Sequence, residues 1–144
     1  MNKKILALFA ASITMTGCSI KQTVTPVESL TEKEVCLIEN PNVKSGFIKV
    51  YKRTLLEKGY LVRQLKPSAS IIECRITSTY NATWRWDMAL YMALAEIKVY
   101  NNGKPIGEAH YDSQSGGANM AKFINAENKI VELVNKLFPG GAGS

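Results

Sequence analysis

Histidines and paired carboxylates are the side chains that most often carry out acid–base and metal chemistry. The 144 residues of this chain contain a single histidine, His110. Glu108 and Asp112 alternate with it, so the three would share one face of a strand. Since the sequence offers no second cluster of ligands or nucleophiles to meet them, we expect His110 to be a solvent-facing strand residue.

The carboxylates show no spacing that is typical of an acid–base pair. They resemble outer-face polar residues of a sheet, at Glu73, Asp87, Glu96, Glu108 and Asp112. Gly116-Gly117 is too short for a phosphate-binding loop and lacks the lysine that follows in such a loop. We therefore predict no catalytic residue, no metal site and no cofactor, and expect that the protein is not an enzyme.

The N-terminal segment has the three parts of a bacterial secretory signal. Lys3 and Lys4 give a positive start, an apolar stretch runs from Ile5 to Ile13, and Met15-Thr16-Gly17-Cys18 ends with a small residue before a cysteine. This lipobox predicts a signal peptide over residues 1–17 and acylation of Cys18 with palmitate-type chains. The alternatives are a short transmembrane helix, for which the apolar run is too short, and an ordinary signal peptide followed by an incidental cysteine.

Several acyl chains on Cys18 would hold the protein on a membrane, since each buried CH₂ contributes about 0.8 kcal/mol. The residue after Cys18 is Ser19. Resemblance to lipoproteins that are sorted by this position implies transfer to the outer membrane, with the protein facing the periplasm. Residues 18–33 are polar, rich in threonine and interrupted by Pro26, so we expect a lipid anchor and a flexible tether there.

Composition predicts one domain, over residues 34–139, with a modest core, because 46% of the chain is hydrophobic. The net charge is +6, and removal of Lys3 and Lys4 leaves 16 basic against 12 acidic residues. These charges are mixed along the chain without the one-sided basic cluster of a nucleic-acid binder. We therefore expect no nucleic-acid partner.

The first half of the domain predicts a strand, a helix and two further strands. Residues 34–40 and 60–65 are short β-rich runs, each closed near a proline. Between them, apolar residues recur at steps of three and four over residues 43–58, and Gly59 supplies a helix stop. Residues 70–80 alternate between apolar and polar side chains, which predicts a third strand.

The strongest local signal is a hairpin around Asn101-Asn102-Gly103. We expect one long strand before it, from about Thr83 to Tyr100, and a return strand over residues 104–112. The good helix formers in residues 88–97 leave a helix capped by Asp87 as the alternative. A second amphipathic helix follows over residues 123–137, and residues 140–144 are expected to be a disordered tail. The sum is an α+β, two-layer βαβββα sandwich, with two helices packed on one face of a mainly antiparallel sheet.

Strand alternation divides the long strand into two chemically different faces. One face carries Ala89, Ala93, Ala95 and apolar β-formers; the other is a candidate interaction surface made of Trp84, Trp86, Met88, Leu90, Met92 and Leu94. Two alternatives stay open. Either the tryptophan and methionine face packs under the helices, or it is an uncovered patch for a partner, a second copy or a ligand; a bulge near Arg85 to Asp87 would exchange the faces.

Two cysteines remain once Cys18 is assigned to lipid. Cys36 lies in the first predicted strand and Cys74 in the third. If these strands are neighbours, the two side chains can form a disulfide bond in the oxidising periplasm. Two buried free thiols are the alternative.

Several motifs resemble those of a family of small Gram-negative bacterial lipoproteins of unknown function. The resemblance covers nearly the whole mature chain and rests on STY at residues 78–80, WRWD at 84–87, ALYMA at 89–93, YNNGK at 100–104, EA at 108–109, YDS at 111–113 and GGAN at 116–119. It implies a lipoprotein and provides no catalytic residues. More loosely, the order of elements is similar to that of small lipoproteins that help to assemble outer-membrane machinery.

These features predict a membrane-anchored, periplasm-facing lipoprotein that acts without catalysis. We expect an envelope protein or a second copy of the chain as its partner. The alternative is a periplasmic ligand-binding module that uses the face with Trp84, Trp86 and the methionines.

Overall fold

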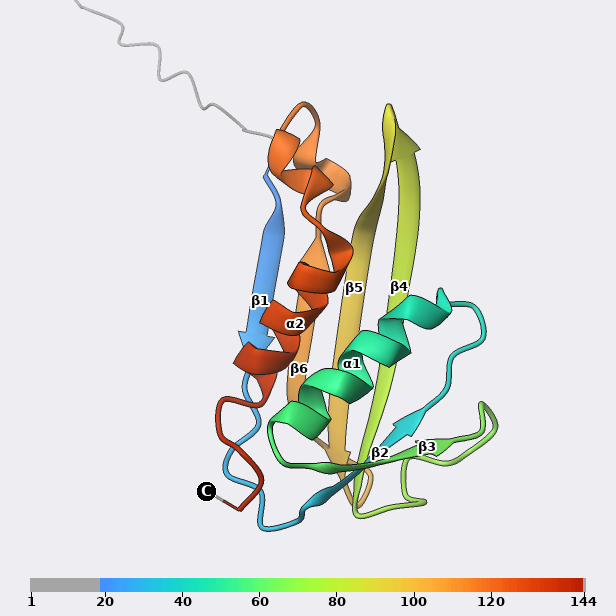
Figure 1. The fold of residues 1–144 in the computed structure, drawn as a ribbon, viewed down its shortest axis with the longest axis vertical. Coiled ribbons are helices and arrows are strands. Elements are labelled where there is room, and N and C mark those ends of the chain that lie inside the picture. Colours follow the sequence, from blue (N-terminus) through green and yellow to red (C-terminus); the bar gives the residue numbers. More distant parts are fainter. Residues whose placement is uncertain (1–18, 144) are drawn as a thin grey trace, which may run out of the picture.

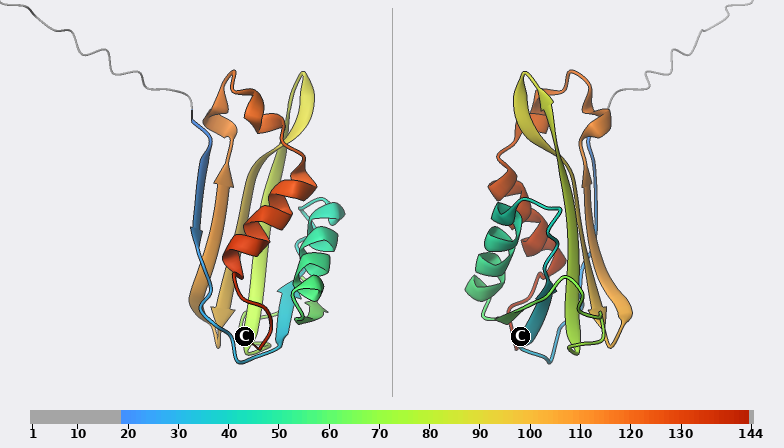
Figure 2. Two further views of the ribbon diagram at one scale, coloured as in Figure 1. Left: turned by 60° about the vertical axis from the view of Figure 1, so that its left-hand side comes forward. Right: turned by 90° about the vertical axis from the view of Figure 1, so that its right-hand side faces the viewer.

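A computed structural model describes residues 19–143 of the chain. The predicted signal peptide, the predicted acylation site Cys18 and the last residue, Ser144, lie outside the described residues. The described part folds into two layers, with one sheet and two helices on the same face of it, as Figures 1 and 2 show. The predicted α+β sandwich is confirmed.

The described strands form one mixed sheet in the order β1-β6-β5-β4-β2-β3. Their bounds are β1 (Lys21–Thr25), β2 (Glu34–Ile38), β3 (Leu61–Leu65), β4 (Ile76–Asp87), β5 (Ala89–Asn101) and β6 (Lys104–Asp112). Strand β2 runs parallel to both β3 and β4, and the other pairs are antiparallel. The helices are α1 (Ser45–Glu57) and α2 (Ala126–Leu137), and two short 3₁₀ turns, η1 (Gln114–Gly116) and η2 (Met120–Phe123), follow β6.

The β2-α1-β3 unit follows the sequence pattern. Helix α1 buries Phe47, Tyr51 and Leu55, which lie four residues apart and so share one side of the helix. Phe47 stacks on Tyr80 of β4 with 5.1 Å between the ring centroids. Gly59, with a φ of +88°, ends the helix and lets the chain return into β3.

The predicted tether is wrong for residues 21–25, because these residues form β1. Each of them pairs with a residue of β6, from Asp112 back to Glu108. Val27 is also buried, and its N–H donates to the carbonyl oxygen of Leu137 at 2.8 Å. In a five-residue edge strand with mostly polar side chains, the alternation of apolar and polar residues is too short to be told apart from a polar linker. The side chain of Ile20 also packs against the core, so the folded domain includes the chain from Ile20 onward.

The predicted disordered tail is also wrong for the residues that the structure describes. The N–H of Ala142 donates to the carbonyl oxygen of Lys58 at 3.0 Å, and its side chain packs against the core. The chain after α2 thus returns to the end of α1.

The third and fourth strands differ from their predicted bounds. Residues 71–75 are turns and bends, and β4 begins only at Ile76. It then continues to Asp87, so both tryptophans belong to β4 and not to the strand before the Asn101 turn. The chain reverses at Met88, which has a φ of +59°, and Asp87 pairs with Ala89 across the reversal. Sequence reasoning missed this turn because no glycine, asparagine or proline marks it.

The small residues of β6 allow α2 to approach the sheet closely. A Cβ atom on Gly107 would lie 2.6 Å from Val27 Cγ2 and 3.1 Å from Leu137 Cδ1. Ala95, Ile97 and Val99 of β5 are fully buried in the same core. The apolar face of the sheet is thus the one that carries the helices.

Candidate interaction surface

The reversal at Met88 divides the six residues of the predicted interaction surface between two strands. Trp84 and Trp86 lie on β4, whereas Leu90, Met92 and Leu94 lie on β5. Two cross-strand pairs result, Trp84 with Met92 and Trp86 with Leu90. These residues therefore do not alternate along one strand.

A register shift in the β4–β5 ladder decides which face each side chain occupies. Thr83 pairs with Leu94, but the next residue, Trp84, pairs with Met92, so Ala93 of β5 is an extra residue. A bulge of this kind resets the alternation. Beyond it Met92 faces the core together with Ala95.

The six side chains consequently have different surroundings. Met92 is 2% exposed in the core, and Trp84 packs against the core with the ammonium of Lys44 5.2 Å from its ring centroid. Leu94 is half-buried. By contrast Trp86 is 74% exposed, Met88 is 90% exposed and Leu90 is 55% exposed. The set is thus partly core and partly uncovered, and the uncovered residues lie at the tip of the β4–β5 hairpin.

The 3₁₀ turns after β6 lie beside this hairpin tip (Figure 1). Buried Lys122 joins the two: its ammonium forms an ion pair with the Asp87 carboxylate and donates to the carbonyl oxygen of Gly117 at 2.6 Å. It also lies 5.4 Å from the ring centroid of Tyr91, which packs edge-on against Phe123. Lys122 thereby neutralises the carboxylate at the tip.

Between the hairpin tip and η2 there is a mainly apolar hollow of about 610 Å³. It is lined by Asp87, Met88, Ala89, Gly117, Ala118, Met120, Lys122 and Phe123. Met120 is itself 73% exposed. Sequence reasoning did not find this contribution from η2, since Met120 lies in a stretch without regular periodicity.

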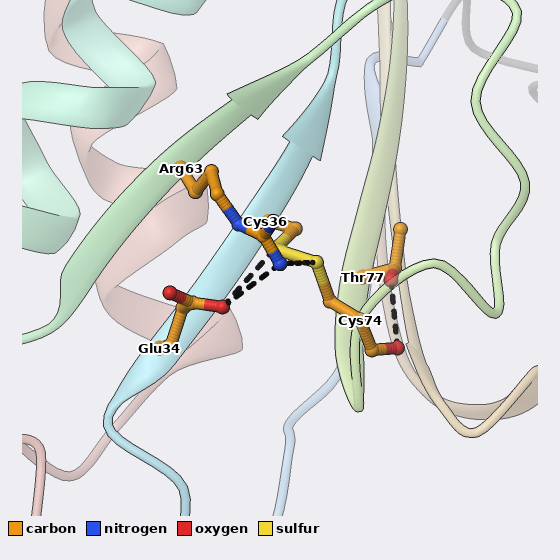
Figure 3. The surroundings of a disulfide bond; sticks show 5 residues. All are labelled: Glu34, Cys36, Arg63, Cys74 and Thr77. Atoms are coloured by element: carbon orange, nitrogen blue, oxygen red, sulfur yellow. Dashed lines mark hydrogen bonds and ion pairs between the residues drawn. A yellow bond between two sulfur atoms is a disulfide. The ribbon is translucent and has the colours of Figure 1, made fainter.

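The predicted disulfide bond between Cys36 and Cys74 is confirmed, with an S–S distance of 2.02 Å. Figure 3 shows the guanidinium of Arg63 beside it: Nη2 lies 2.8 Å from Cys74 Sγ and 3.2 Å from Glu34 Oε1. Glu34 and the two cysteines have the close spacing of a metal-ligand group. Because the sulfurs are bonded to each other they offer no thiolate, so this group is a disulfide site and not a metal site.

Of the histidine and the carboxylates weighed in the sequence, Glu96, Glu108, His110 and Asp112 lie on the neighbouring strands β5 and β6, whereas Glu73 and Asp87 lie elsewhere. His110 lies half-buried on β6, where it pairs with Thr23 of β1 and Glu96 of β5. Glu96 forms an ion pair with Lys98, which raises the pKa of that lysine. Glu73 lies in the turns before β4. Within residues 19–143 none of these groups belongs to a cluster with the close spacing of metal ligands.

A polar cluster that the sequence did not reveal joins β1 to α2. Gln22 and Lys136 donate to Glu132 Oε1, both at 2.8 Å, and Lys129 donates to Glu132 Oε2 at 2.6 Å. The hydrogen bonds from Gln22, Lys129 and Lys136 lower the pKa of Glu132 from 4.5 to about 2. Lys129 also lies 5.0 Å from the ring centroid of Tyr111. The cluster was missed because Gln22 had been assigned to a tether.

In the part of the chain that the structure describes, neither helix is long and apolar enough to cross a membrane.

No protein-family model matches the sequence, and no curated protein matches it. Solved structures of the PelC dodecamer from Paraburkholderia phytofirmans do match the fold. One of them, a single-residue variant, aligns over 88% of this chain and 100% of the PelC chain with a TM-score of 0.57. A second aligns over 86% and 99% with a TM-score of 0.55. The sequence identity is 15% in both, so the likeness shows a shared fold.

Proposed function

We propose that this protein is a lipoprotein of the bacterial outer membrane, anchored through Cys18 and facing the periplasm, and that it acts by protein contact without catalysis. The lipobox ending in Cys18 is the observation that carries the proposal. The structure adds that β1 begins at Lys21. With only Ser19 and Ile20 between Cys18 and that strand, an acylated Cys18 would hold the folded domain directly against the membrane.

Metabolic labelling with palmitate tests the anchor. The wild-type chain and the double variant Cys36→Ala/Cys74→Ala are expected to incorporate label and to start at Cys18 by intact mass, whereas Cys18→Ala is not. The double variant is the matched control, because it removes the other two cysteines. Label in Cys18→Ala, or a mature chain that starts elsewhere, would overturn the proposal.

We further propose that the domain associates with copies of itself. Its structural neighbours are PelC dodecamers. Within the described residues, β1 and β3 form the two outer edges of the sheet, and edge strands offer unpaired backbone groups to another chain. Leu61 on the β3 edge is also largely exposed.

Native mass spectrometry of the mature protein in detergent tests self-association. A single closed oligomer is expected for the wild type, and Leu61→Lys at the edge is expected to dissociate it, while Ile72→Lys, away from both edges, leaves it intact. A monomeric wild type at micromolar concentration would contradict the proposal.

The hollow beside η2 favours a ligand-binding module as a second candidate function, since its volume lies within the usual range for small-molecule sites. Affinity purification of the lipidated protein from solubilised membranes distinguishes the two. A stoichiometric protein supports the contact function, and a small molecule that co-purifies supports the ligand module.

A further inference from the structure

Exposed apolar side chains gather at one end of the sheet. Among the described residues, Trp86, Met88 and Leu90 of the hairpin and Met120 of η2 are each more than half exposed. We call these four residues the apolar tip. Met88 and Met120 line the same hollow. Trp86 and Leu90 pair across the two strands on the opposite face of the hairpin from Asp87 and Ala89, which line that hollow, so the tip is apolar on both faces. Exposed apolar side chains that gather at one place in this way mark a contact with a partner or a membrane.

The N-terminus enters the domain at this same end. Lys21 of β1 pairs with Asp112 of β6, Asp112 pairs with Leu94 of β5, and Leu94 pairs with Thr83 of β4. These four residues therefore mark one level across the sheet. Figures 1 and 2 show β1 starting at the end that carries the β4–β5 reversal and the 3₁₀ turns.

The hairpin projects beyond this level toward the side from which the chain arrives. Met88 is five residues past Thr83, which at about 3.3 Å per residue places the tip about 16 Å farther out. Three residues separate Cys18 from Lys21 in the sequence, and a segment of that length reaches at most about 10 Å. A Cβ atom on Gly116 would lie 3.4 Å from Ile20 Cγ1, so the chain next to Cys18 rests on η1.

We propose that the apolar tip docks into the interface of the lipid bilayer that holds the Cys18 acyl chains. This inference rests on the proposed lipid anchor and adds an orientation to it. Tryptophan, methionine and leucine are suited to the boundary between headgroups and acyl chains. Because the acyl chains are covalently bound to Cys18, the bilayer that holds them must lie beside this end of the domain.

The charges around the apolar tip agree with a lipid surface as its occupant. Asp87, the carboxylate at the reversal, is neutralised by its ion pair with Lys122. Arg85 of β4 and Lys21 of β1 are exposed on the same end. Basic side chains beside an apolar tip favour anionic lipid headgroups.

Two single cysteines with an environment-sensitive fluorophore test the docking. In the mature lipidated chain Cys18 is acylated and Cys36 is bonded to Cys74, so Met88→Cys introduces one reactive thiol. The matched control is Ile72→Cys: Ile72 is an apolar residue, 67% exposed, that lies against Gly103 in the hairpin turn at the other end of the sheet. In phosphatidylglycerol-containing vesicles we expect a several-fold rise in emission for the label at residue 88 and little change at residue 72, as expected for groups within about 10 Å of the headgroup boundary.

The two tryptophans give a second measurement that does not depend on labelling. In the variant Trp84→Phe, which retains Trp86, vesicles with brominated acyl chains are expected to quench most of the emission. In Trp86→Phe, which retains the core-packed Trp84, quenching is expected to be weak. Flotation of each variant with the vesicles reports on the anchor separately.

Each outcome decides the inference. A protein that floats with the vesicles while residues 86 and 88 stay in an aqueous environment retains the anchor and overturns the docking. Shielding of residue 88 from aqueous acrylamide without bromolipid quenching of Trp86 would show that a second copy or a ligand covers the tip, which also overturns it. Failure to float would overturn both the anchor and the docking.

Discussion

At the scale of single residues, two non-glycine residues in the described chain have a positive φ angle, and each lies at a hairpin turn. Met88 has a φ of +59° and Asn102 one of +49°. Asparagine tolerates this left-handed region, whereas a methionine side chain is less favourable there. The Asn102 turn could accordingly be predicted from the sequence and the Met88 turn could not.

Exchanging the two residue types should therefore change stability in opposite directions. Met88→Asn is expected to raise the free energy of unfolding by about 0.5–1 kcal/mol, and Asn102→Met to lower it by about 1 kcal/mol. Urea denaturation measures both. A loss of stability in Met88→Asn would mean that the Met88 side chain makes contacts that outweigh the strain of its backbone.

The disulfide bond could be predicted by elimination, because two cysteines remained once Cys18 was assigned to lipid in a chain that we expected to be exported. It closes a loop between residues 38 apart in sequence. By the chain-entropy estimate, Cys36→Ala/Cys74→Ala should lower the free energy of unfolding by about 4 kcal/mol. Thermal melts with and without reductant check this, and a wild-type melting temperature that reductant leaves unchanged would contradict it.

At the scale of elements, the helices and the Asn102 hairpin followed their sequence patterns, whereas β1 and the bulge at Ala93 did not. Helical periodicity extends over three turns in α1 and α2 and so is robust. Strand β1 has five residues and owes its place to pairing with residues 83 to 91 positions later in the chain. The bulge exchanged the faces of the candidate surface, and nothing local in the sequence marks it.

The polar cluster between β1 and α2 should make stability depend on pH. The folded state holds the pKa of Glu132 at about 2, below its ordinary value of 4.5. Its contribution is therefore complete above about pH 4.5 and is lost as the pH falls toward 2. Because the carboxylate is about one-third exposed, we expect only about 1 kcal/mol.

The variant Glu132→Gln should remove this contribution and flatten the stability profile between pH 4.5 and 2. Glu57→Gln, on the exposed side of α1, is the matched control. Denaturant titrations at several pH values measure the effect. Parallel profiles for Glu132→Gln and the wild type would show that the cluster adds no net stability.

Close packing of α2 on the sheet gives a second prediction at this scale. Gly107→Ala should cost about 1–3 kcal/mol, because its Cβ would overlap Val27 and approach Leu137. Gly46→Ala is the opposite case: its Cβ would have no neighbour within 4 Å, and alanine should stabilise helix α1 by about 0.5–1 kcal/mol. Equal effects of the two substitutions on the melting temperature would contradict the packing described here.

At the scale of the whole molecule, the fold class could be predicted from the sequence and the arrangement of the candidate surface could not. Apolar periodicity is enough to order helices and strands into two layers. The position of the apolar tip depends on three distant features, the Met88 reversal, the bulge and η2, which meet only in the folded chain. The likeness to PelC dodecamers shows a shared fold. The contacts that this domain makes with a membrane or a partner are a proposal about this chain.

The central claim is that the end of the sheet where β1 begins faces the membrane. NMR spectra of the mature lipidated protein in nanodiscs, with and without a gadolinium-bearing lipid headgroup, test it most directly. We predict that amide signals of residues 86–90 and 117–121 are attenuated most and those of residues 71–75 and 102–104 least. Uniform attenuation, or the strongest attenuation at residues 71–75 and 102–104, would contradict the account.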